Sequence, residues 1–131
     1  MYNLLTILKA ILHFIRGVSD YVVEEDTSGI FNYRKWNSGK MEVWGVWRGT
    51  VTNYTSFSVF SGYVTTITLP TVCQFISTPQ LNYNTQVGSG FAMPGSGTMG
   101  VSTTQFNAYA VSTVSGSATF TVLFQLRGHW K

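Results

Sequence analysis

The N-terminal segment carries a helical pattern of apolar residues. Their spacing alternates between four and three, which is the spacing of the a and d positions along a coiled-coil seam. Isoleucine at these positions favours three strands over two, and a seam this short needs a trimeric domain behind it. The pattern predicts a trimeric helical stalk; the alternative is an amphipathic helix that packs on its own domain. The predicted seam consists of Leu4, Leu8, Ile11, Ile15, Val18 and Val22.

We expect the helix to end before the rest of the domain begins. Gly17 and an acidic cluster at residues 24–26 are helix-ending signals, and residues 27–29 (Thr-Ser-Gly) are typical of a hinge. The sequence therefore divides into a helical stalk with its hinge, residues 1–26, and a β-sandwich head, residues 27–131.

After the hinge, the apolar pattern changes to that of β-strands. Residues 30–36 and 40–48 flank residues 37–39 (Asn-Ser-Gly), a three-residue hairpin loop whose glycine suits a positive φ. This register places Arg34 opposite Glu42 and predicts an ion pair across the hairpin. Glu42 then has a structural partner, which argues against a catalytic role.

Further strands follow, separated by turn residues. In the last of them, residues 117–129, every second residue is large and apolar, so that set faces a core and its neighbours face solvent or a partner subunit. Six or more strands predict a mainly β chain, an antiparallel β-sandwich behind a short N-terminal α-helix. The glycine-rich segment 88–100 is expected to be an exposed loop. The other predicted strands span residues 63–69, 81–87 and 104–111.

The distribution of charge decides which functions are open to this fold. Between Gly49 and Leu126 the sequence has no acidic residue, no basic residue and no histidine. Acid–base catalysis and metal binding both use such side chains. What fills this stretch is Thr, Ser, Asn, Gly and aromatic residues, which suit binding through hydroxyls, amides and rings. A binding or structural module is therefore predicted, and not an enzyme.

The remaining titratable residues suggest no catalytic or metal site. His13 and His129 have no acid near them in sequence, so they do not form a nucleophile triad. Two histidines and Cys73 do not make a strong metal site, and we expect neither a metal nor a cofactor. Glycosidase carboxylates would have to come from the acidic cluster and Glu42, which leaves open a site between subunits.

Bulk composition limits the partners. The 131 residues suffice for one domain with a core, and the net charge of +3 comes from scattered lysines and arginines. Without a basic cluster, nucleic-acid binding is not expected. Lys9, His13 and Arg16 interrupt the apolar N-terminal segment, so we expect neither a signal peptide nor membrane insertion. Cys73 lies in an apolar run and is predicted to be a buried free thiol.

The candidate ligand contacts lie near the C-terminus. Gln125, Arg127 and His129 alternate with the apolar set of the final strand and therefore share its outward face. In a trimer this face can border a groove between subunits, where Tyr109 or Trp130 would stack on a sugar ring. Any single aromatic residue is more often core than ligand contact. The alternative for Arg127 and His129 is that they hold the base of the trimer together.

Three segments resemble one family. The hairpin GIFNYRKWNSGKMEVWG resembles the opening hairpin of C-terminal head domains in phage and prophage tail fibres and baseplate proteins. The segments ITLPTVCQFISTPQLNYN and TFTVLFQLRGHWK are similar to later strands of those heads. The resemblance spans residues 27–131, with departures at Asn32 and Arg127. Related heads resemble the H-type lectins, which are trimeric sandwiches that bind sugars.

The resemblance implies a role on the virion, exposed to the host exterior. It implies a homotrimer on a coiled-coil stem, other tail or baseplate proteins as partners, and a host cell-surface carbohydrate as receptor. A purely structural virion or fibre-trimerisation domain without a ligand is the alternative, and a polysaccharide depolymerase is a third hypothesis. The ligand does not carry over from the family, because sugar-binding residues vary between these heads.

Overall fold

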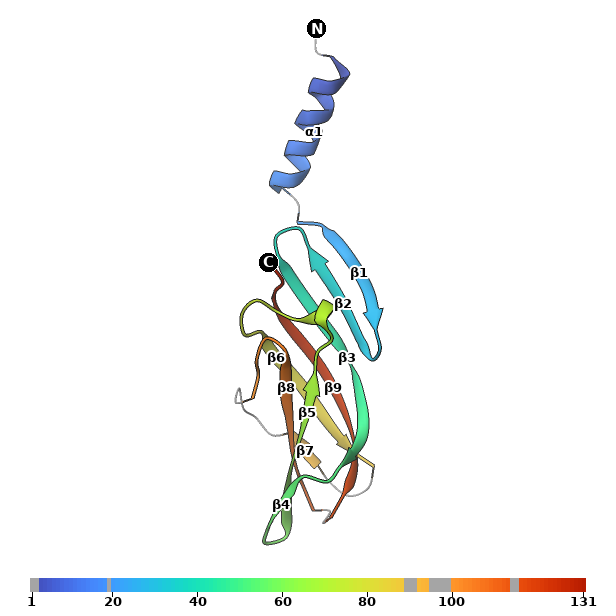
Figure 1. The fold of residues 1–131 in the computed structure, drawn as a ribbon, viewed down its shortest axis with the longest axis vertical. Coiled ribbons are helices and arrows are strands. Elements are labelled where there is room, and N and C mark those ends of the chain that lie inside the picture. Colours follow the sequence, from blue (N-terminus) through green and yellow to red (C-terminus); the bar gives the residue numbers. More distant parts are fainter. Residues whose placement is uncertain (1–2, 19, 89–91, 95–99, 114–115) are drawn as a thin grey trace.

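A helix and an elongated β domain make up the chain in the computed structural model. The helix α1 (Leu4–Val18) projects from one end of the β domain, and the C-terminus lies near that same end (Figure 1). The chain is mainly β with one short N-terminal helix, as the sequence predicts. The residues that the structure describes are 3–18, 20–88, 92–94, 100–113 and 116–131.

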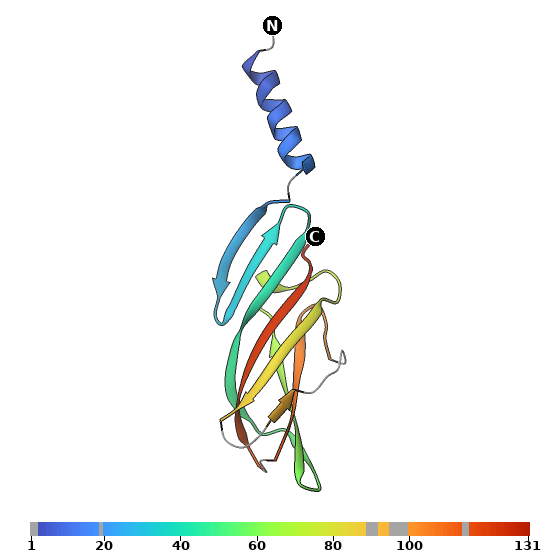
Figure 2. The same ribbon diagram turned by 180° about the vertical axis from the view of Figure 1, so that it is seen from behind.

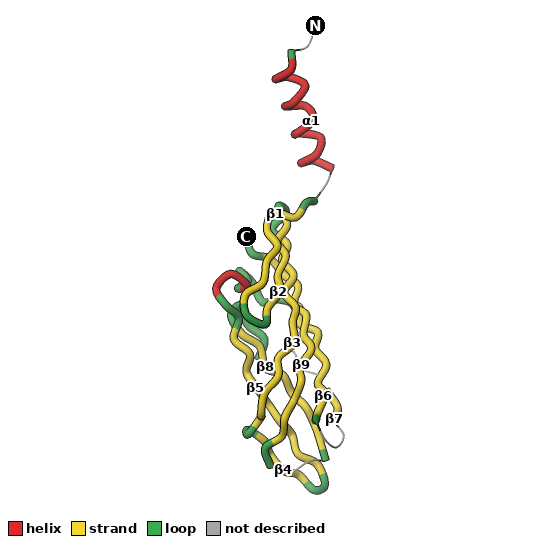
Figure 3. The backbone as a smooth tube through the Cα atoms, turned by 90° about the vertical axis from the view of Figure 1, so that its right-hand side faces the viewer, coloured by secondary structure: helices red, strands yellow, loops and turns green. Residues whose placement is uncertain are grey.

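Two antiparallel sheets form the β domain and lie against each other as layers (Figure 3). The strands are β1 (Val22–Ser28), β2 (Phe31–Trp36), β3 (Lys40–Val51), β4 (Tyr54–Phe57), β5 (Phe60–Thr68), β6 (Gln80–Val87), β7 (Ala92–Pro94), β8 (Gln105–Ser112) and β9 (Ala118–His129). A 3-10 helix, η1 (Thr71–Cys73), follows β5. The five-stranded sheet has the order β1-β2-β3-β9-β6, and the four-stranded sheet has the order β4-β5-β8-β7.

The core forms between the sheets because strands bury alternate side chains. On β9, the predicted apolar set of Phe120, Val122, Phe124 and Leu126 is buried, while the residues between them are half-buried or exposed. Full burial of such a side chain is worth roughly 1.5–3 kcal/mol. Cys73 is a buried free thiol, as predicted, and burial raises the pKa of this thiol to about 11.

The β2–β3 hairpin has the predicted loop and register. Gly39 has a φ of 97°, and Arg34 lies opposite Glu42. Gly39 also holds the C-terminus next to the β2–β3 loop. Its carbonyl oxygen accepts a 2.9 Å hydrogen bond from the backbone N–H of Trp130. A Cβ at this position would lie 2.7 Å from the carbonyl oxygen of Lys131, so only glycine fits without a shift.

The segment before β2 differs from the prediction. The acidic cluster lies in the edge strand β1, and residues 27–29 lead into a hairpin turn with Gly29 at a φ of 60°, so the predicted hinge is wrong. Val22, which the heptad pattern assigned to the helical seam, instead pairs with Trp36 in the sheet. The sheet therefore begins before the predicted boundary at residue 27.

Complementary charges explain why an acidic segment forms this strand. In the register of β1 and β2, Glu24 lies opposite Lys35 and Glu25 lies opposite Arg34. Opposite charges across strands stabilise the pairing, and charged side chains on an edge strand hinder pairing with further chains. The Asp20 carboxylate extends the contact, since it accepts a 2.6 Å hydrogen bond from the Ser38 hydroxyl in the β2–β3 loop.

Helix α1 stands clear of the sandwich. The side chains of residues 3–14 are exposed, including Leu4 at 72% and Ile11 at 49% of their surface. The alternative that this helix packs on its own domain is therefore wrong for the described residues. Ile15 and Val18 lie within the helix as predicted, but their side chains are outside the described part, and the coiled coil stays a prediction.

The glycine-rich segment 88–100 is not entirely a loop. Ala92–Pro94 forms β7, which pairs with β8 at the edge of the four-stranded sheet and was not predicted. Residues 89–91 and 95–99 of the predicted loop lie outside the described residues.

Candidate functional site

The candidate site lies on the face of the five-stranded sheet that points away from the four-stranded sheet, which we call the outer face (Figure 2). Two rows of side chains cross it at neighbouring register positions. One row joins Arg34, Glu42 and Arg127 from β2, β3 and β9. The other row joins Asn32, Trp44 and Gln125 from the same strands. The outer face thus carries charged and aromatic groups, whereas the inner side of β3 and β9 is apolar where it meets the core.

A hollow of about 530 Å³ opens beside the charged row, toward the helix end of the domain. Within it, Arg127 Nε lies 3.4 Å from Glu42 Oε1, and both side chains remain partly exposed. Lys40 Nζ lies 3.9 Å from Asp20 Oδ2 at the border. An exposed pair contributes little to stability, so exchanging these contacts for contacts to a polar ligand would cost little free energy. The charged hollow is lined by Asp20, Trp36, Lys40, Met41, Glu42, Arg127, Gly128 and His129.

Arg34 has a different ionic partner from the one predicted. Its Nη2 donates a 2.8 Å hydrogen bond to Glu25 Oε1 on β1, and this bond raises the pKa of Arg34. The predicted partner Glu42 instead pairs with Arg127. The guanidinium carbon lies 5.8 Å and 5.7 Å from the ring centres of Trp36 and Trp44, so the arginine bridges two indole rings by cation–π contacts.

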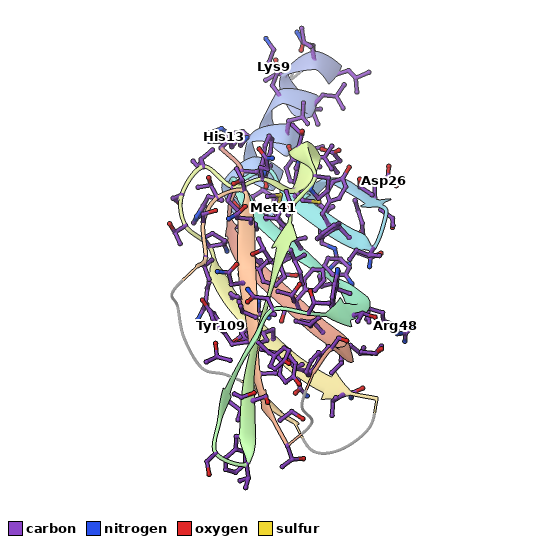
Figure 4. The ribbon with its side chains drawn as sticks, turned by 60° about the horizontal axis from the view of Figure 1, so that its bottom comes forward. Lys9, His13, Asp26, Met41, Arg48 and Tyr109 are labelled. Atoms are coloured by element: carbon purple, nitrogen blue, oxygen red, sulfur yellow. The ribbon has the colours of Figure 1, made fainter. Side chains whose placement is uncertain are left out.

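The structure brings together three of the predicted ligand contacts. Gln125, Arg127 and His129 follow one another along the outer face of β9, with Gln125 half-buried and the other two exposed. Tyr109 belongs to β8 in the other sheet, and Figure 4 shows it on the opposite side of the domain from Arg48 of β3. Its backbone N–H donates a 3.1 Å hydrogen bond to the hydroxyl of Tyr83. Tyr109 and Arg127 therefore do not share a site within one chain.

Trp130 also lies apart from the outer face. Its ring packs against the main core cluster, and its Nε1 donates a 3.1 Å hydrogen bond to the Trp36 carbonyl oxygen. The amino groups of Lys35 and Lys131 lie 5.3 Å and 5.0 Å from the ring centre. These contacts tie the C-terminus to β2, which is a structural role.

Glu24 and Tyr33 form a linked pair on the inner side of β1 and β2. The hydroxyl of Tyr33 donates a 2.7 Å hydrogen bond to Glu24 Oε1, and Lys35 Nζ lies 3.4 Å from Glu24 Oε2. The hydrogen bond from Tyr33, together with Lys35, lowers the pKa of Glu24. The same bond raises the pKa of Tyr33 to about 12. Both shifts favour the charged carboxylate and the neutral phenol in the folded state.

This pair predicts an acid-sensitive contribution to stability. A carboxyl group whose pKa is lowered by folding stabilises the protein above its ordinary value of 4.5 and loses that contribution as the pH falls through the folded value. We expect Glu24→Gln to lower the melting temperature at neutral pH, and the gap from the wild type to shrink below pH 4.5. Thermal unfolding from neutral to acidic pH measures it. An equal difference in melting temperature between Glu24→Gln and the wild type at neutral and at acidic pH would contradict a stabilising role of the Glu24 carboxylate.

Sequence reasoning missed the two indole rings and the lysine that complete the outer face. Trp36, Trp44 and Lys40 belong to the predicted hairpin, and its register already placed Trp36 and Trp44 on the same side as Arg34. The alternation of β2 and β3 was the signal that could have identified them. The neighbours contributed by β9 could not be identified in this way, since the pairing of β3 with β9 joins distant segments.

Among the described residues, no group of three or more His, Cys, Asp and Glu side chains comes together in a way that could hold a metal ion. No helix in the described part of the chain is both long and apolar enough to cross a membrane.

Comparison with known proteins adds a structural neighbour. No protein-family model matches the chain, and no curated protein matches it. An N-truncated R1-type pyocin tail fiber is similar in structure, with a TM-score of 0.59 over 98% of this chain and 98% of that chain. The sequence identity is 12%, so the likeness is one of fold. The helix and two-layered β domain described above thus form a fold shared with a pyocin tail fiber.

Proposed function

We propose that this chain is the receptor-binding head of a phage tail fibre or baseplate protein, and that it attaches the particle to a glycan on the host surface. The observation that carries the proposal is the outer face, where Arg127 and His129 line an open hollow with Trp36, and Gln125 and Trp44 lie at the next register position. The likeness to the pyocin tail fiber supports a tail-fibre domain. Such a head works as a binding module without catalysis, alongside other tail proteins.

Assembly as a homotrimer through α1 is part of the proposal. The described seam residues Leu4, Leu8 and Ile11 are exposed, and so are the apolar residues on both of their flanks, Leu5, Ile7, Leu12 and Phe14. A 15-residue helix standing in water is marginal by itself, because nucleation is unfavourable and no tertiary packing supports it. Association with two more copies would cover the seam and supply that packing.

A structural role without a ligand is the second candidate. Val46 and Leu123 on the outer face are 38% and 41% exposed, and Ile30 beside them is 42% exposed. Exposed aliphatic side chains in a group also occur at subunit interfaces. In that case the outer face would be covered by a neighbouring copy and would bind no glycan.

The double substitution Arg127→Ala with His129→Ala separates these roles. If the charged hollow binds the receptor, the labelled protein should bind bacterial envelopes at least about tenfold more weakly, because two hydrogen-bonding groups are lost. The mass in solution should stay that of the wild type. Pull-down on a panel of Gram-negative and Gram-positive envelopes and light scattering measure the two properties.

A matched control comes from the same face. Arg48 is exposed on β3 and lies opposite Thr121, away from the charged hollow, so Arg48→Ala removes an equal charge there. This variant should bind envelopes like the wild type. Normal binding by the double variant would reject the charged hollow as the site, and a smaller mass would make Arg127 and His129 assembly residues instead.

A further inference from the structure

A second depression lies next to the charged hollow on the outer face. It is a shallow groove of about 710 Å³ that crosses β2, β3, β9 and β6. Register places Gln125 between Trp44 and Asn82, and Leu123 between Val46 and Asn84. We call it the amide groove, after the side chains that border it: Trp44, Val46, Asn82, Asn84, Leu123 and Gln125.

The lining of the amide groove is neutral. Among the described residues, no acidic residue, basic residue or histidine borders it, in contrast to the charged hollow beside it. The carboxamides of Asn82, Asn84 and Gln125 make no hydrogen bond to the described part of the chain. Each carboxamide offers both donors and an acceptor, which is the pattern that a sugar hydroxyl can satisfy from either side. The groove therefore presents three neutral carboxamides that have no hydrogen-bond partner among the described residues.

The aromatic side of the amide groove is held in place before any ligand binds. Trp44 lies 5.7 Å from the guanidinium carbon of Arg34, which Glu25 fixes in turn through the 2.8 Å hydrogen bond. Asn32, opposite Trp44 in the register, donates a 3.4 Å hydrogen bond to the Trp44 backbone carbonyl oxygen, which ties β2 to β3 at this position. A ring that is fixed in advance loses little conformational entropy on binding, and so more of the contact energy becomes affinity.

We propose that the amide groove binds a neutral pyranose of the receptor glycan. The apolar face of the sugar ring stacks on Trp44 and contacts Val46 and Leu123, while its hydroxyls bond to Asn82, Asn84 and Gln125. This inference rests on the proposed function and specifies its ligand class. An anionic substituent on the same glycan would reach the charged hollow across the row of Arg34, Glu42 and Arg127.

A second copy of the chain is the competing occupant of the amide groove. Its apolar residues Val46 and Leu123 would suit such an interface. The amides argue for a sugar instead, because burying carboxamides against a protein surface costs free energy unless each finds a partner. A sugar ring carries several hydroxyls close together, so one ring can hydrogen-bond to all three carboxamides. The face of a strand in a second copy would need a separate, correctly placed side chain for each carboxamide.

The test is binding of the full chain to an array of neutral and anionic pyranosides. The wild type should bind neutral glycans, and Asn82→Ala with Gln125→Ala should reduce that binding at least about tenfold. Trp44→Ala should reduce the binding of neutral glycans by a similar factor. The Trp44→Phe variant keeps a smaller aromatic ring, so its glycan binding should be weaker than that of the wild type and stronger than that of Trp44→Ala. Gln86→Ala is the matched control, since Gln86 lies on β6 opposite Thr121 and outside the groove.

Each outcome of the array decides one question. Groove variants that keep wild-type mass and melting temperature but lose neutral glycans support the proposal. If the wild type binds glycans or envelopes and the groove variants bind equally well, the amide groove is rejected and the receptor-binding function stands. A wild type that binds neither glycans nor envelopes overturns both. Groove variants of reduced mass identify the groove as a subunit interface and also reject the sugar site.

Discussion

Replacing Ile11 by asparagine is expected to dissociate the assembly. The wild type should scatter light as a particle of three times 14.5 kDa, and the Ile11→Asn variant as a single chain. Ile11 occupies the middle of the predicted seam, where three side chains meet and water is excluded, so an amide there would lose its hydrogen bonds to water without gaining partners. Because three linked heads bind a surface far more tightly than one, envelope binding should fall about a hundredfold or more.

The matched control introduces the same side chain on the other face of the helix. His13 lies off the seam, and Figure 4 shows it labelled on the exposed helix. His13→Asn should leave both the mass and the envelope binding unchanged. A wild type that is already a single chain at micromolar concentration, or an Ile11→Asn variant of unchanged mass, would contradict the coiled-coil stalk. The β domain should keep its melting transition in both helix variants, because no described side chain of α1 belongs to the core clusters.

Local patterns predicted the parts of the fold that depend on neighbouring residues in the chain. The loop at residues 37–39 fixes the β2–β3 register, since its length and its glycine leave one way to close the hairpin. Alternation along β9 identified the buried set, because a strand between two layers has two distinct faces. The same reasoning located Gln125, Arg127 and His129 on one face.

What the sequence did not predict depends on which distant strands become neighbours. Arg34 lies between Glu42 on β3 and Glu25 on β1. The sequence predicted only the β2–β3 pairing, and so it predicted an ion pair with Glu42. Acidic residues are poor strand formers, so β1 was recognisable only once its basic partners on β2 were known. The amide groove needs the order β3-β9-β6, which places Trp44, Gln125 and Asn82 side by side although they lie far apart in sequence.

A glycine at the centre of the five-stranded sheet gives the second large effect. Gly45 lies between Phe31 and Phe124 in the register of β2, β3 and β9. The two phenyl rings meet above it with their centres 5.4 Å apart. A Cβ at position 45 would overlap the carbonyl oxygen of Ile30 and lie 2.9 Å from Phe124 Cζ. The missing side chain therefore makes room both for the ring pair and for the β1–β2 turn.

Gly45→Ala is expected to lower the free energy of unfolding by about 3 kcal/mol, because the obstacle is backbone and a buried ring and neither yields easily. The melting temperature should fall by about 10 °C or more. Gly88→Ala is the control, since a Cβ there would have Thr119 O as its nearest neighbour at 3.8 Å, an ordinary contact. Calorimetry of both variants measures the difference. If Gly45→Ala melts within about 2 °C of the wild type, Phe31 and Phe124 can separate without loss, and this ring pair does not hold the centre of the sheet.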